Sequence, residues 1–306
     1  MNLKKKFLLA GAACGLLLSA SAWAVPLTLQ NNWVQAGVSD YGTLGSNGST
    51  PPGILYDPTG TGTYGVNDFL TPGTPFEGFF LTSDQGGWYG DNSWSSNYGT
   101  WVLTQVSPTE GTAEATSSDG LVKTRHEYQL TESGGIVRIA IKTTITNESA
   151  DPITSLKFLR TLDPDPDVNV YGNYDTKNVV VSAARACGTG LSTDQTICID
   201  TAGSPYTFRA GVSEDWLEDP SAYLGGLNDG DGDYAIGLAF DIGTLAAGAS
   251  AVLEYSYILS ETSGGVVPTG SVTAVPTLEA WGLGLLSGGM VLLAAVRRRK
   301  SRSTAA

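Results

Sequence analysis

The stretch LVKTRHEYQLTESGGIVRIAIKTTITN, residues 121–147, decides the fold. In its first half, charged or polar residues alternate with the side chains expected inside, which are Val122, Thr124, His126, Tyr128 and Leu130. A Ser-Gly-Gly sequence at residues 133–135 follows, and a second alternating run continues from Val137 to Ile145. Successive side chains on a strand point to opposite faces, so this pattern predicts two strands with one buried face each. The glycines between them predict a tight turn.

The same kind of pattern continues on both sides of this stretch. Leu156, Phe158 and Leu162 form the next inward-facing set. Further strands are expected at Val179–Ala186, Tyr206–Val212, Tyr234–Ile242 and Ala251–Ser260. Upstream, glycine, threonine, serine and asparagine dominate residues 37–99, which predicts short strands with many turns. With no helical period, the chain is predicted to be mainly β, and its exported part (the ectodomain) to be an antiparallel β-sandwich.

The N-terminus has the pattern of a secretory signal peptide over residues 1–24. Three lysines at residues 4–6 precede an apolar run from Phe7 to Leu18. Ala22 and Ala24 supply the small residues of a cleavage site before Val25. A retained N-terminal helix and lipidation at Cys14 are the alternatives.

The C-terminus has the pattern of a single transmembrane helix. Residues 280–296 carry no charge, and as a helix they would extend about 26 Å, enough to span a thin bilayer. The basic stop-transfer cluster that follows is Arg297, Arg298, Arg299 and Lys300. Basic residues stay on the cytoplasmic side, so the preceding residues are expected outside and residues 301–306 inside. A buried core helix is the alternative.

The residues before this span resemble a known sorting signal. They comprise Val275, Pro276, Thr277, Leu278, Trp281 and Gly282. Together with the span and the basic cluster, they are similar to the IPTL-CTERM sorting domain over residues 275–300. Val275 stands where that family has isoleucine, and Glu279 places the usual acid one position early. The resemblance implies a Gram-negative bacterial protein that an exosortase-type membrane enzyme recognises and cleaves near Pro276-Thr277.

The segment between the two ends is strongly acidic. Residues 25–275 contain nine lysines and arginines against 29 aspartates and glutamates, which gives a net charge of −20. Such a surface repels nucleic acid and anionic lipid, and it favours solubility and divalent cations. We divide this segment into a Gly/Thr/aromatic-rich β region at 25–120, a β-sandwich region at 121–261 and a stalk at 262–274. The acidity has a simpler interpretation as a solvated surface.

Cys187 and Cys198 are the two cysteines outside the signal peptide. Because they are expected outside the cytoplasm, the sequence predicts a disulfide between them. Two reduced buried thiols are the alternative.

Familiar catalytic motifs are missing from the sequence. His126 is the one histidine, and its place on the inward face of a strand favours a core residue over a catalytic one. We find no Gly-x-Ser-x-Gly motif and no phosphate-binding Gly-Lys-Ser/Thr loop. The sequence therefore predicts a chain that is not an enzyme. A pair of carboxylates acting on a glycan would not be recognisable, because their separation in space is not readable from sequence.

Two runs of aspartates are candidate calcium ligands, since calcium takes six to eight oxygen ligands. The candidates are Asp163, Asp165 and Asp167 in one run, and Asp229, Asp231 and Asp233 in the other. Prolines in the first run are expected to hold the chain extended, with the three carboxylates on the same side. Neither run has the spacing of an EF-hand, and ordinary turn chemistry is the alternative. Calcium is the one cofactor that the sequence suggests.

Three tryptophans, Trp88, Trp94 and Trp101, lie in a Gly/Ser/Asn-rich stretch. Exposed aromatic planes could stack on sugar rings. The favoured interpretation is that they cap the sandwich core, since aromatic side chains bury the largest apolar areas.

These patterns favour an exported cell-surface or extracellular-matrix protein with a structural or adhesive role. Its expected partners are the export machinery, an exosortase-like enzyme and a surface polysaccharide or matrix. Two stretches support a surface role, because residues 144–159 and 245–250 resemble parts of Ig-like sandwich modules of bacterial surface proteins. A carbohydrate-binding module is the first alternative, and a glycan-active enzyme is the second.

Overall fold

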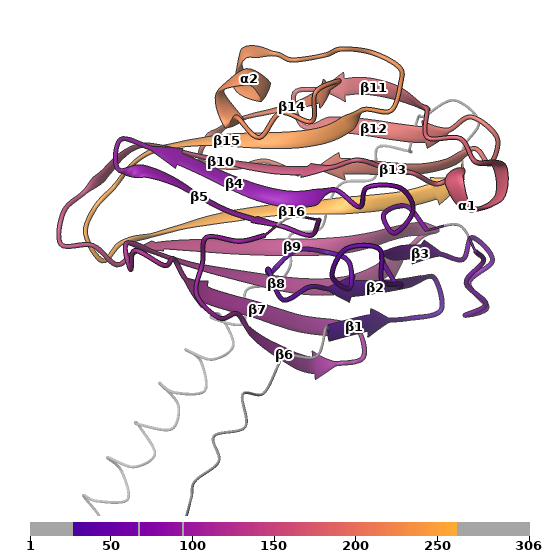
Figure 1. The fold of residues 1–306 in the computed structure, drawn as a ribbon, viewed down its shortest axis with the longest axis horizontal. Coiled ribbons are helices and arrows are strands. Elements are labelled where there is room, and N and C mark those ends of the chain that lie inside the picture. Colours follow the sequence, from indigo (N-terminus) through magenta and orange to yellow (C-terminus); the bar gives the residue numbers. More distant parts are fainter. Residues whose placement is uncertain (1–26, 67, 94, 262–306) are drawn as a thin grey trace, which may run out of the picture.

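A computed structural model describes residues 27–66, 68–93 and 95–261 (Figure 1). The expected signal peptide, stalk, sorting signal and transmembrane helix lie outside the described residues. Within the described part of the chain, no helix is long and apolar enough to cross a membrane.

The larger sheet contains the hairpin that the sequence predicted. β8 (Val122–Ser133) pairs antiparallel with β9 (Ile136–Asn147) across the turn at Gly134 and Gly135. Both glycines have positive φ, 62° and 80°, as this two-residue turn requires. The sheet has eight described strands, in the order β11 (Thr176–Ser182), β12 (Arg185–Gly190), β13 (Gln195–Asp200), β16 (Ser250–Glu261), β9, β8, β7 (Glu110–Thr116) and β6 (Val102–Ser107).

Two smaller sheets complete the described β structure. The order of the five-stranded sheet is β14 (Thr207–Ser213), β15 (Ala235–Leu245), β10 (Ile153–Leu162), β4 (Glu77–Ser83) and β5 (Gly86–Asp91). The three-stranded sheet consists of β1 (Leu27–Gln30), β2 (Val34–Val38) and β3 (Ile54–Tyr56). Strands from before residue 121 therefore pair with strands from after it, β4 with β10 and β7 with β8.

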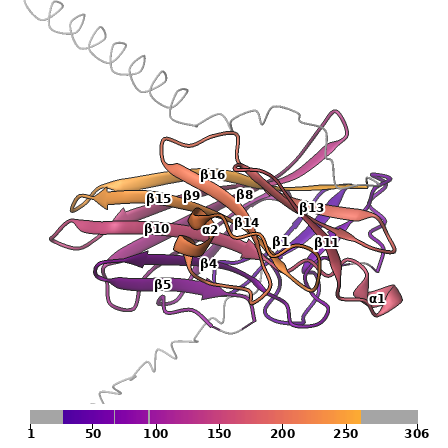
Figure 2. The same cartoon turned by 90° about the horizontal axis from the view of Figure 1, so that it is seen from above.

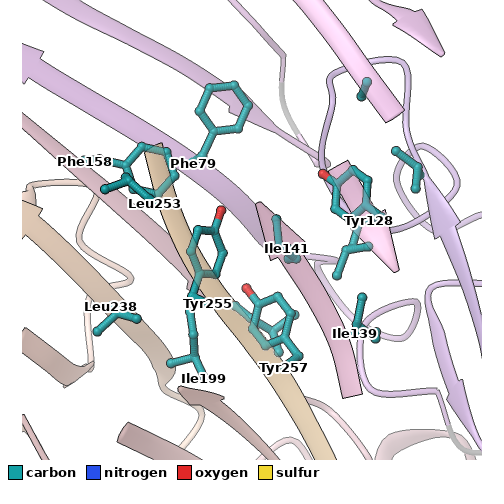
Figure 3. Close-up of a cluster of buried hydrophobic side chains, with 14 of the residues drawn as sticks. Phe79, Tyr128, Ile139, Ile141, Phe158, Ile199, Leu238, Leu253, Tyr255 and Tyr257 are labelled. Atoms are coloured by element: carbon teal, nitrogen blue, oxygen red, sulfur yellow. The ribbon is translucent and has the colours of Figure 1, made fainter. Parts of the chain in front are cut away.

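The eight- and five-stranded sheets pack face to face around an aromatic core (Figure 3). Phe158 of β10 lies 6.0 Å from Tyr255 of β16 and 6.4 Å from Phe79 of β4, measured between ring centroids. All three side chains are buried. The predicted antiparallel β-sandwich is confirmed, with sheets larger than those of an Ig-like module, which has seven to nine strands in total.

A helix covers the other face of the five-stranded sheet (Figure 2). α2 (Pro220–Gly225) places the buried ring of Tyr223 against Phe80 and Leu159, in a cluster separate from the main core. A second short helix, α1 (Val168–Tyr171), follows the end of β10.

The expected strand at Val179–Ala186 is wrong in its bounds. This segment contains the end of β11, a turn and the start of β12, and the next strand, β13, was not anticipated. All residues of β12 and β13 are buried, so neither strand shows the alternation by which half-exposed strands are recognised. Cys187 and Cys198 face each other across these two strands and form a disulfide.

Candidate functional site

Three aspartates far apart in sequence meet at one end of the sandwich. Leu162, the last residue of β10, pairs with Ile236 near the start of β15. This register brings Asp163 and Asp165, which follow β10, close to Asp233, which precedes β15. Carboxylate oxygens of the three residues lie within 4.8 Å of one another. We call these residues the aspartate cluster.

The backbone around the aspartate cluster holds it against a neighbouring loop. The amide of Asp163 donates to the carbonyl of Phe76, and the amide of Asp165 donates to that of Phe69, both at 2.9 Å. Between these two acceptors, Gly73 has a φ of 71°, a left-handed conformation that favours glycine. A Cβ at Gly73 would lie 2.7 Å from Cε1 of Tyr174 and 3.0 Å from Oδ2 of Asp165. The tyrosine ring and the carboxylate therefore both lie against this glycine.

The carboxylates of the aspartate cluster are buried together. Asp163 and Asp165 are each only 2% exposed, and Asp233 is half-buried. Burial and, next, the carboxylates of its neighbours raise the pKa of Asp163 well above its usual value. Burial and then Asp233 raise the pKa of Asp165 to about 8. Burial and then Asp175 raise the pKa of Asp233. Negative charge at this site is therefore unfavourable unless something positive compensates it.

The prediction that Asp167 projects with Asp163 and Asp165 is wrong. Asp167 has helical backbone angles, φ −97° and ψ −11°, because α1 begins at the next residue. The chain therefore turns away from the extended path that the prolines impose on Asp163 and Asp165. Its carboxylate instead accepts hydrogen bonds from the amides of Ser192 and Thr193, at 2.6 and 3.1 Å.

The other two predicted ligands, Asp229 and Asp231, also bind backbone amides. Oδ2 of Asp229 accepts from the amide of Glu214 at 2.9 Å, and Oδ1 of Asp231 accepts from the amide of Asn178 at 2.8 Å. These bonds fix the loop that carries Asp233. Of the six predicted aspartates, the structure thus brings three into one cluster and uses three to hold the surrounding loops.

Two aromatic side chains that the sequence patterns did not single out, Tyr174 and Trp216, lie beside the aspartate cluster. Tyr174 is 43% exposed, and its ring lies against Gly73 beside Asp165. Trp216 donates from its indole nitrogen to the carbonyl of Asp233 at 3.2 Å and stacks on Phe76, with ring centroids 5.5 Å apart. The sequence signal for Tyr174 is weak, because this residue lies in an irregular segment shortly after the Asp-Pro run.

The tryptophans proposed as sugar-stacking residues do not form an exposed surface. Trp88 is 2% exposed and donates to Oδ2 of Asp119 at 2.8 Å. Trp101 is 3% exposed and stacks on the ring of His126. Trp94 lies outside the described residues. Buried faces cannot stack on a sugar, so Trp88 and Trp101 belong to the core.

His126 is fully buried between the sheets. Its Nδ1 lies 2.8 Å from Oγ1 of Thr143, and its ring packs 4.7 Å from that of Phe79. Burial, and then the positive charge of Arg160, lower the pKa of His126 well below its usual value. The imidazole is therefore neutral at physiological pH and serves as a core residue.

Comparison with protein families decides the class of the C-terminal segment. A family model described as the IPTL-CTERM motif matches residues 273–300. The chain carries an IPTL-CTERM sorting motif. This confirms the resemblance seen in the sequence, and the motif marks the chain as a membrane-anchored surface protein. No curated protein matches the sequence.

Comparison with solved structures finds several that are similar to this chain. A bacterial glucoamylase complexed with acarbose matches with a TM-score of 0.50 and 8% identity, over 79% of this chain and 33% of the glucoamylase. A putative aldose 1-epimerase from Escherichia coli K12 matches with a TM-score of 0.45 and 12% identity, over 78% and 99% of the two chains. A galactose mutarotase related enzyme from Lactobacillus acidophilus matches with a TM-score of 0.37 and 11% identity, over 79% of this chain and 99% of the enzyme. The IPTL-CTERM chain thus spans about a third of the glucoamylase.

The glucoamylase match corrects the prediction that the chain is not an enzyme. That prediction rested on the sorting motif, the acidic β ectodomain and the missing catalytic motifs. The observed fold is one found within a glucoamylase, so the absence of a recognisable motif no longer argues against an enzyme. At 8% identity the match establishes the shared fold, and activity has to be argued from the site.

Proposed function

We propose that the IPTL-CTERM chain is an exported surface protein whose sandwich recognises a carbohydrate beside the aspartate cluster. The observation that carries this proposal is the exposed ring of Tyr174, held against Gly73 next to the carboxylate of Asp165. Aromatic rings present a flat apolar face with a polar tip, which suits the apolar face and hydroxyl rim of a sugar. The fold shared with part of a glucoamylase supports the same ligand class.

The charge of the ectodomain narrows the class of carbohydrate. Its net charge of −20 repels anionic polysaccharides. Beside Tyr174 in the chain, the exposed carboxylate of Asp175 adds local negative charge. We therefore expect a neutral or amino-substituted glycan as the ligand. Recognition of such a polymer would also provide the adhesive role that the sequence suggested.

Replacing Tyr174 by alanine is expected to abolish retention of the full chain on the polysaccharide that binds it. Removal of a stacking aromatic at the centre of a binding site typically costs 2 kcal/mol or more, roughly a 30-fold loss of affinity. The measurement is retention on a panel of insoluble neutral and amino-substituted polysaccharides. Folding should be intact, because Tyr174 lies at the surface, where it is 43% exposed.

Val106→Ala is the matched control for Tyr174→Ala. Val106 is also exposed, at 62%, but it lies on β6, at the edge of the eight-stranded sheet opposite to β11. Its truncation should leave retention unchanged. If the parent protein binds nothing on the panel, or if both variants bind as it does, the carbohydrate site proposed here is wrong.

Turnover of the bound sugar is the second candidate, favoured by the occurrence of this fold within a glucoamylase. The same panel, incubated with the full chain and assayed for new reducing ends, tests it directly. Retention without any new reducing ends would leave recognition alone as the function.

Export, insertion and processing complete the proposal. We expect the signal peptide to be cleaved after Ala24, and an exosortase-like enzyme of a Gram-negative inner membrane to cleave near Pro276-Thr277. Intact mass of the protein purified from its own cells should then place the mature C-terminus close to Thr277. A mass that retains every residue to Ala306 would contradict processing and leave a chain held by its membrane span.

A further inference from the structure

We propose that Asp163, Asp165 and Asp233 bind one calcium ion, which fastens the segment after β10 to the loop before β15. This inference goes beyond carbohydrate recognition and does not depend on it. It rests on the arrangement and burial of the three carboxylates, and on their lack of side-chain partners outside the aspartate cluster.

The spacing of the carboxylates fits one ion. Calcium binds oxygen ligands at about 2.3–2.6 Å, so two ligand atoms on the same ion are at most about 5 Å apart. The three carboxylate oxygens lie within 4.8 Å of one another. Bidentate binding by a carboxylate and added water could complete the six to eight ligands that calcium takes.

The oxygens of the aspartate cluster lack other partners. Oδ1 of Asp163, of Asp165 and of Asp233 are buried and accept no hydrogen bond. Asp165 is the clearest case, because it is 98% buried and its carboxylate takes part in none of the hydrogen bonds found in the described part of the chain. A buried carboxylate without a partner costs several kcal/mol, as a buried ion does, unless a proton or a cation compensates it.

No side chain supplies that compensation. Within residues 27–261 as the structure describes them, none of the three aspartates forms an ion pair with a lysine or arginine. Aspartates used only for turn chemistry accept bonds from nearby amides, as Asp167, Asp229 and Asp231 do. The buried Oδ1 atoms of the aspartate cluster accept no such bonds, which favours binding of an ion over a role in turn formation.

The burial of the aspartate cluster selects a small ligand. Asp163 and Asp165 are too enclosed to touch a polymer, whereas a single ion can bind between them. The ion would also fix Asp165 against Gly73, where the ring of Tyr174 packs. Calcium would therefore order the surface that carries Tyr174 without contacting the sugar.

The test is thermal unfolding of the full chain, kept in detergent, in EDTA and in calcium. At calcium concentrations a hundred times the dissociation constant, the melting temperature should rise by about 5–10 °C for a domain of this size. Isothermal titration with calcium should give one site per chain. Equal melting temperatures in EDTA and in millimolar calcium, together with no titration signal, would overturn the proposal. A larger rise with magnesium would overturn the choice of ion.

The variant Asp165→Asn tests whether the calcium response comes from the aspartate cluster. This variant should lose both the calcium-dependent rise and the titration signal, while melting in EDTA no lower than the parent, since it removes an uncompensated charge. The matched control is Asp215→Asn, the same change at an exposed aspartate outside the aspartate cluster, which should keep the full response. Should Asp165→Asn fail to fold, the parent titration still decides whether an ion binds. An Asp165→Asn protein that keeps the calcium response would refute the assigned ligands.

Discussion

Replacing Glu77 by glutamine, with Arg160 left in place, is expected to lower the free energy of unfolding by about 3–5 kcal/mol. Both side chains have no exposed surface, and they form an ion pair in the core between the sheets. Arg160 donates from Nε and Nη2 to the two carboxylate oxygens, the Nη2 bond being 2.8 Å long. Loss of the carboxylate charge would leave a buried guanidinium uncompensated, and this sets the size of the effect.

The surroundings of Glu77 explain why neither partner is easily lost. Tyr257 donates to one carboxylate oxygen at 2.9 Å, and the amide of Leu44 donates to the other at 2.7 Å. Tyr128 accepts from Nη2 of Arg160 at 3.3 Å. Burial opposes the charge of Arg160, but the Glu77 carboxylate raises its pKa above the usual value. The guanidinium therefore stays charged and needs its partner.

Urea unfolding followed by circular dichroism measures the free energy of unfolding of the parent and of Glu77→Gln. Replacing both partners, Glu77→Gln with Arg160→Met, should recover much of the lost stability, because the uncompensated charge is then gone. The matched control is Glu114→Gln, which breaks partly exposed pairs with Lys123 and Arg125 and should cost less than about 1 kcal/mol. A Glu77→Gln variant as stable as Glu114→Gln would show that the buried charge does not control stability.

How much of this fold can be predicted from the sequence depends on whether each strand has a face exposed to solvent. β8 and β9 could be predicted because one face of β8 and of the second half of β9 is partly exposed, and their alternation and glycine turn are visible in the chain. β12 and β13 could not, because both of their faces are buried and the alternation vanishes. The pairing of β4 with β10 also lies beyond the reach of local patterns, since β10 comes much later in the chain.

The aspartate cluster shows the same limit at the level of a site. Asp163 and Asp165 could be paired from sequence, because the intervening proline keeps that segment extended. Asp233 is 70 residues away from Asp163, and only the register of β10 with β15 brings it to them. Asp167 was grouped wrongly because α1 begins immediately after it. The candidate ligands could be identified by residue type. Which of them lie together depends on how the strands pair in the folded chain.

Replacing Trp101 by alanine is expected to lower the free energy of unfolding by about 3–5 kcal/mol, because it empties a packed aromatic site. The indole is 3% exposed and packs 5.1 Å from the ring of Tyr98 and 5.7 Å from those of Phe79 and His126. A Cβ on Gly42 would lie 2.5 Å from it, so the backbone also closes on the ring. Urea unfolding followed by circular dichroism gives the change.

Tyr174→Ala is the natural comparison for Trp101→Ala, since both remove an aromatic ring. The tyrosine lies at the surface and is 43% exposed, so its loss should leave the free energy of unfolding within about 0.5 kcal/mol of the parent while abolishing polysaccharide retention. Trp101→Ala should do the reverse, and weaken retention only where the protein unfolds. A Trp101→Ala protein of full stability that no longer binds polysaccharide would return the sugar site to the tryptophans. The two substitutions therefore separate an aromatic that builds the sandwich from one that the sandwich presents to a ligand.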